Sequence, residues 1–183
     1  MVERIVSTTL SDHDRGLIDV VTGLPHKILR HHTLDGLSQM VLHELGHESG
    51  FGFDKATYLI DNPDFDHLLG VAGFDRQECQ MHKQNIWDQP ECFCKDMESA
   101  SFHTRVRNIL NNSFSRKDIN LNEAHDIKAL GLELGIKDPH FFSWNMKHGN
   151  HGLLIFERNE NICLWRQGLL KNMSALLSMC GLH

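Results

Sequence analysis

Two histidines and one glutamate stand at a spacing that can bind a metal ion and activate water. His43 and His47 are four residues apart, so on a helix both imidazoles project from one face, about one turn apart, and can bind one zinc ion. Glu44 follows the first histidine and can act as general base on a metal-bound water. The pattern predicts a zinc-dependent hydrolase of peptide or amide bonds.

The flanking residues predict that this motif lies on a helix. An apolar stripe recurs at helical spacing and consists of Leu34, Leu37, Val41 and Leu45. Thr33 or Asp35 can cap the start of the helix, and Gly50 lies just past its end. The two histidines fall on roughly the opposite side from the stripe, so we expect them to face a ligand or solvent.

The stretch from residue 43 to residue 50, His-Glu-Leu-Gly-His-Glu-Ser-Gly, resembles the zinc-binding helix and turn of the metzincin metalloproteases. The resemblance implies that both histidines are zinc ligands and that Glu44 is the general base. It also implies that Gly50 turns the chain toward a third ligand, which that family places three residues later. Here this position is Phe53, and Asp54 follows it. The resemblance covers this stretch and does not extend to the metzincin fold.

A catalytic zinc ion takes three protein ligands and keeps one position for water, so a third ligand is needed. Asp54 is the first candidate because it is the nearest in sequence and follows the turn. His67 is the second candidate, on the next predicted helix together with Asp64. Glu78 would match the ligand arrangement of other zincins. The sequence leaves these alternatives open.

A second group of possible zinc ligands follows within sixteen residues and consists of Cys79, His82, Cys92 and Cys94. Three cysteines and one histidine are a ligand set that structural zinc sites use. The spacing lacks two regular Cys-x-x-Cys knuckles. The alternative is a set of reduced thiols and a loop histidine in a protein without metal.

Two functions therefore stay open. The first is a zinc-dependent hydrolase built on the motif helix, with an unknown substrate. The second is a non-catalytic cytoplasmic protein that holds a structural zinc ion, or no metal, and acts by binding a protein partner. Glu44 discriminates between them, because a structural site needs the histidines but has no use for a general base.

Composition narrows the class of protein. A chain of 183 residues that is 40% hydrophobic can bury one sizeable core. Its formal net charge of -6 argues against a nucleic-acid surface, and the absence of an apolar run of about 18 residues argues against a membrane span. Five cysteines and an N-terminus without the apolar core of a signal peptide suggest the reducing cytoplasm.

The elements that must position these residues are mostly helical. We predict one α+β domain over residues 1–183, with a small β-hairpin near the C-terminus that pairs the apolar runs 153–156 and 162–165. A short strand is expected at 4–10. Besides the motif helix, helices are expected near residues 14–23, 25–31, 64–70, 97–110, 121–134 and 168–180.

Overall fold

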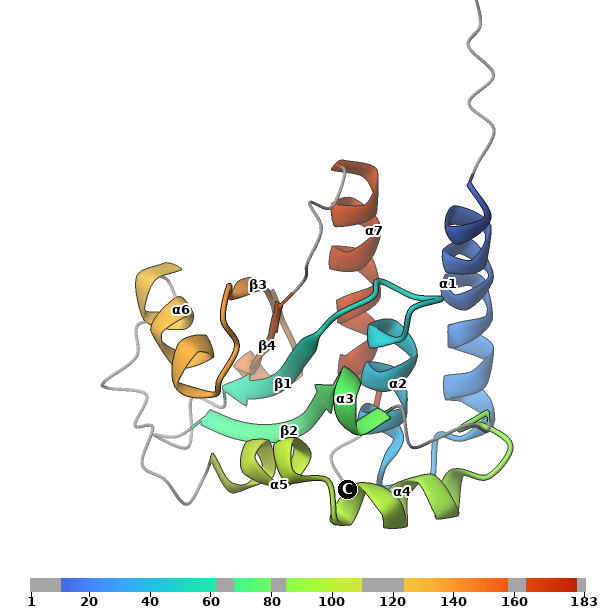
Figure 1. Cartoon of the computed structure of the whole chain (residues 1–183), viewed down its shortest axis with the longest axis horizontal. Helices are drawn as coiled ribbons and strands as arrows, with labels where there is room; N and C mark the ends of the chain where they lie inside the picture. Colours follow the sequence, from blue (N-terminus) through green and yellow to red (C-terminus); the bar gives the residue numbers. More distant parts are fainter. Residues whose placement is uncertain (1–10, 62–67, 80–84, 110–123, 158–163, 181–183) are drawn as a thin grey trace, which may run out of the picture.

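A four-stranded antiparallel sheet forms the centre of the fold (Figure 1). The structure is a computed structural model that describes residues 11–61, 68–79, 85–109, 124–157 and 164–180. The strands are β1 (Lys55–Asp61), β2 (Leu68–Asp75), β3 (His140–Asn145) and β4 (His151–Glu157). They lie in the order β2-β1-β4-β3, so β1 and β4 are the central strands although more than eighty residues separate them in sequence.

Helices cover both faces of this sheet (Figure 1). The described helices are α1 (Asp12–Arg30), α2 (Leu37–Gly46), α3 (Arg76–Cys79), α4 (Pro90–Glu98), α5 (Ser101–Arg107), α6 (Ala124–Glu133) and α7 (Leu164–Ser174), with short 3₁₀ turns η2 (Lys147–Gly149) and η3 (Ala175–Met179). One core cluster joins the sheet to α1, α2, α4 and α7, and a second joins the opposite face to α5 and α6. None of the described helices is long and apolar enough to cross a membrane.

The central strands β1 and β4 are mostly apolar between their ends, because both of their faces are buried there. In β4, Leu154 and Phe156 belong to the first core cluster, whereas Leu153 and Ile155 belong to the second. This division follows from the period of two along a strand, which sends successive side chains to opposite faces. The sheet is therefore the middle layer of three.

The α+β class is confirmed, but the predicted C-terminal hairpin is wrong. The run 153–156 does form part of β4, which pairs with β3 on one side and β1 on the other. Of the second run, Leu164 and Trp165 begin α7, and residues 162–163 lie outside the described residues. The strands that complete the sheet come from the middle of the chain.

The predicted helix near 64–70 is also wrong, since the described part of that region is strand β2. Gly70 and Gly73 suggested the end of a helix, but their role is to let α5 approach the sheet. A Cβ atom on Gly70 would collide with the backbone carbonyl oxygen of Val106 on α5. The strand therefore contains glycine where another backbone packs closely against it.

Other predicted helices are partly correct. A single helix, α1, covers 14–23 and continues through 25–30, with Ser11 and Asp14 forming a capping box at its start and Pro25 inside it. The expected helix over 97–110 is divided between α4 and α5, whereas α6 and the pair α7–η3 confirm the last two predictions. Residues 4–10 lie outside the described residues.

Candidate functional site

The first four residues of the His-Glu-x-x-His motif lie on α2, which packs between β2 and the helices α1 and α4. The His43 ring is buried between two aromatic rings, in edge-on contact with Phe74 at 5.1 Å and with Phe93 at 4.8 Å between centroids. Its Nδ1 atom lies 3.1 Å from the Sγ atom of Cys79, at the end of α3. The fold thus joins a histidine and a cysteine that are 36 residues apart.

The Cys79 side chain is a thiol at neutral pH. Its burial, and next to that the negative charges of Asp75 and Glu78, raise the pKa of Cys79 to about 12. The thiol can donate a hydrogen bond to His43 at the observed distance. Nitrogen and sulfur ligands of a tetrahedral zinc ion lie about 3.6 Å apart, so metal binding would require this pair to open by about 0.5 Å.

Both carboxylate oxygens of Glu44 have partners. Oε1 lies 2.6 Å from Nζ of Lys27 on α1, and Oε2 accepts a hydrogen bond from Nε1 of Trp87 at 2.7 Å. The Lys27 ammonium also lies 5.5 Å from the centroid of the Trp87 ring. This cluster of three side chains, which sequence reasoning did not predict, ties α2 to α1 and to the segment before α4.

His47 does not continue the helical face of His43. The helix ends at Gly46, and His47 is its C-cap residue with an extended ψ of 160°. The exposed His47 ring has Nδ1 at 2.9 Å from Oγ of Ser49. The helix ends early because the N–H of Phe51 turns back to the carbonyl of Leu45.

One cavity of about 390 Å³ nevertheless contains the main residues of the motif. Its lining includes His43, Glu44, His47, Phe74, Cys79 and Phe93. Imidazole, thiol and carboxylate groups therefore share one opening to solvent. Within the residues that the structure describes, no three His, Cys, Asp or Glu side chains gather as a metal-binding group.

The proposed third ligands lie elsewhere or outside the described residues. Asp54 is 3.5 Å from Nε of Arg76 and does not line the cavity of the motif. Glu78 accepts a hydrogen bond from the backbone N–H of Phe102, at the start of α5. His67 and Asp64 fall in 62–67, outside the described residues.

The cysteine-rich group does not converge in its described part. Cys79 lies beside His43, Cys94 lines a different cavity, and Cys92 is exposed. All three thiols are free, and His82 lies outside the described residues. The partner of Cys79 could not be found from spacing, because the two strands β1 and β2 separate His43 from Cys79 in sequence.

No family model matches the sequence, and no curated protein matches it.

Proposed function

We propose that this chain binds a zinc ion through His43 and Cys79. The observation that carries the proposal is the 3.1 Å separation of Nδ1 and Sγ at the wall of an open cavity. Imidazole nitrogen and thiolate sulfur are common zinc ligands. Zinc displaces the proton of a coordinating thiol, so the high pKa of Cys79 in the protein without metal does not prevent binding.

His47 is the best candidate for a third ligand within the cavity. Its side chain is exposed, and its ring contacts Ser49, through the hydroxyl and the backbone N–H of that residue. Rotation of an exposed side chain is fast, and the loss of each of these contacts costs about 1 kcal/mol. Water would complete the coordination of the ion. The ion would then connect α2 to α3 and stabilise the fold, which is the non-catalytic function that the sequence left open.

Zinc content of the full chain tests this proposal. Protein purified without a polyhistidine tag, loaded with zinc and dialysed, should retain about one equivalent by elemental analysis. Cys79→Ser should lose it, whereas the control Cys92→Ser, at an exposed cysteine, should retain it. The proposal fails if the wild-type chain retains no zinc, or if both variants retain it equally.

Hydrolysis of a peptide or amide bond is the second candidate function. It is favoured by the presence of Glu44, His43 and His47 in the lining of one cavity. For Glu44 to act as a general base, a water molecule must reach one of its carboxylate oxygens beside the contacts to Lys27 and Trp87. Because Lys27 and Trp87 already bind the carboxylate of Glu44, we propose the non-catalytic function before hydrolysis.

A panel of peptide and amide substrates, tested with the zinc-loaded chain, decides between the two functions. If the chain is a hydrolase, Glu44→Gln should retain zinc and lose activity by about a hundredfold or more. Zinc binding without activity on any substrate supports the non-catalytic function. Activity that is equal in Glu44→Gln would contradict the role of this glutamate.

A further inference from the structure

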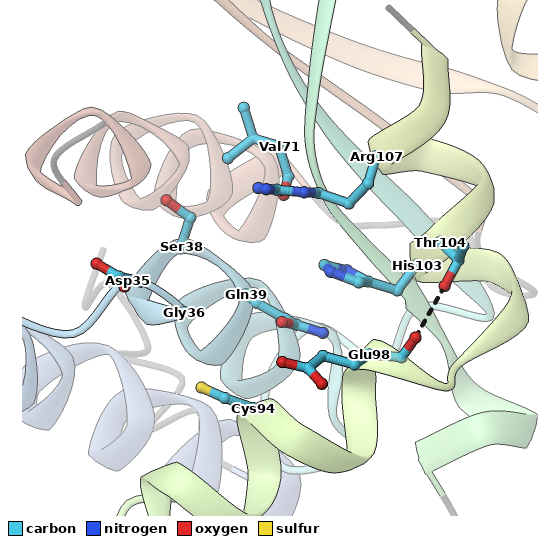
Figure 2. A pocket seen from close by; sticks show the side chains of 10 residues that line it. All are labelled: Asp35, Gly36, Ser38, Gln39, Val71, Cys94, Glu98, His103, Thr104 and Arg107. Carbon is cyan, nitrogen blue, oxygen red and sulfur yellow. Dashed lines mark hydrogen bonds between the residues drawn. The ribbon is translucent and has the colours of Figure 1, made fainter. Parts of the chain in front are cut away.

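A second cavity, of about 510 Å³, lies at the other end of α2, between its first turn and the helices α4 and α5 (Figure 2). Its volume is in the range of sites that bind small molecules. If roughly spherical, it is about 10 Å across. Its lining is mainly polar and charged, which disfavours an apolar ligand.

The inner wall of this cavity offers hydrogen-bond donors. Gln39 is only 6% exposed, and its Nε2 atom has no hydrogen-bond partner among the described residues. A buried amide without a partner costs about 1–3 kcal/mol, a cost that a bound acceptor would remove. In Figure 2 the amide of Gln39 lies between the ring of His103 and the carboxylate of Glu98, which also line the cavity.

His103 presents a second donor. Its Nδ1 atom accepts a hydrogen bond from the backbone N–H of Gly73 at 3.2 Å, so the proton of the neutral ring is on Nε2. Burial, and next to that the charge of Arg107, lower the pKa of His103 to about 4. The ring is therefore neutral at neutral pH and acts as a donor without adding charge.

Charges of opposite sign stand on the rim. Figure 2 shows the guanidinium of Arg107 above the ring of His103 and the carboxylate of Glu98 below it. Asp35 contributes a second carboxylate at another edge. No ion pair joins any two of these charged groups in the described part of the chain. One cation with two carboxylates disfavours a ligand with several negative charges, such as a nucleotide.

We propose that this cavity binds a small zwitterion of dipeptide size. The ligand carboxylate would lie against Arg107 and His103, and its ammonium group against Glu98 and Asp35. Gln39 would donate to a carbonyl or carboxylate oxygen of the ligand. The ends of a dipeptide lie about 7 Å apart, which suits a cavity about 10 Å across better than the shorter span of a single α-amino acid.

Isothermal titration of the full chain tests this proposal with a panel of dipeptides. Dipeptides should bind more tightly than their N-acetyl forms, their C-terminal amides, single α-amino acids and inorganic phosphate. Arg107→Met should weaken dipeptide binding by about tenfold or more, because it removes a charge-assisted hydrogen bond. Arg30→Met, at an exposed arginine on α1, is the matched control and should not change binding.

Gln39→Leu keeps a side chain of similar size and removes the donor, so it should weaken binding while circular dichroism shows an intact fold. The proposal is overturned if no dipeptide binds at millimolar concentration. It is also overturned if Arg107→Met and Gln39→Leu both bind dipeptides as tightly as the wild type, or if phosphate binds more tightly than any dipeptide. If single amino acids bind as tightly as dipeptides, the proposed size of the ligand is wrong.

Discussion

Replacement of Glu44 by alanine should destabilise the fold whether or not the chain binds metal. The Glu44 carboxylate accepts one charge-assisted contact from Lys27 at 2.6 Å and one hydrogen bond from Trp87 at 2.7 Å. Its side chain is 16% exposed, so water replaces these partners only in part. Glu44→Ala leaves both donors without their acceptor.

The expected loss follows from these two contacts. A hydrogen bond to a charged group contributes about 1.5–3 kcal/mol when buried, and the solvent access of Lys27 brings its share below that range. Together the two contacts predict a decrease of about 2–3 kcal/mol in the free energy of unfolding. For a chain of this length, this corresponds to a decrease in Tm of roughly 4–12 °C.

Urea denaturation followed by circular dichroism measures this decrease in protein without metal. Glu44→Gln should lose about half as much as Glu44→Ala, because its amide oxygen can still accept from Trp87. Glu48→Ala, an exposed glutamate in the same stretch, is the control and should change stability by less than about 0.5 kcal/mol. Equal stabilities of the two alanine variants would refute the stabilising role of the contacts of Glu44 with Lys27 and Trp87.

Two further predictions concern the sheet and its contact with α5. Because the pKa of His103 is lowered from 6.5 to about 4, the unfolded chain binds its proton more tightly, so stability is full above pH 6.5 and falls as pH decreases toward 4. Because the ring is partly exposed, the free energy of unfolding should decrease by about 2 kcal/mol over this range. Urea denaturation at neutral and acid pH should show this decrease in the wild type and not in His103→Asn. An equal pH dependence in both proteins would contradict a lowered pKa of His103. Gly70→Ala places a Cβ atom against the backbone of Val106 and should cost about 3 kcal/mol. Gly23→Ala, on α1 with no atom within 4 Å of the added Cβ, should instead stabilise the fold by about 0.5–1 kcal/mol. Thermal melts that give the same Tm for both variants would contradict the close packing of α5 on β2.

Periodicity in the sequence could predict some elements and not others. The pattern of α6 and the glycine after it were sufficient, since Gly135 has the positive φ of 84° that ends a helix in the left-handed region. Strand β2 could not be recognised because both of its faces are buried, so its residues do not alternate between apolar and polar. Its glycines looked like loop residues because their packing role depends on α5, which follows about thirty residues later.

The candidate site, like β2, could be predicted only in part from local sequence. The apolar stripe of α2 was predicted correctly, with Leu37, Val41 and Leu45 in the core. The opposite side was expected to face a ligand or solvent, yet His43 is buried between aromatic rings. Packing of β2 and α4 on two sides of α2 produces this burial. The local sequence of α2 does not predict which distant elements pack against it. The contact with Cys79 depends on that packing.

The absorption spectrum of the chain with cobalt(II) in place of zinc tests the central proposal most directly. A thiolate bound to cobalt gives a ligand-to-metal charge-transfer band in the near ultraviolet, which imidazole and water ligands do not produce. We expect this band in the wild-type chain and in Cys92→Ser, and its loss in Cys79→Ser. A wild-type spectrum without the band, or a band that persists in Cys79→Ser, would contradict a metal site at His43 and Cys79.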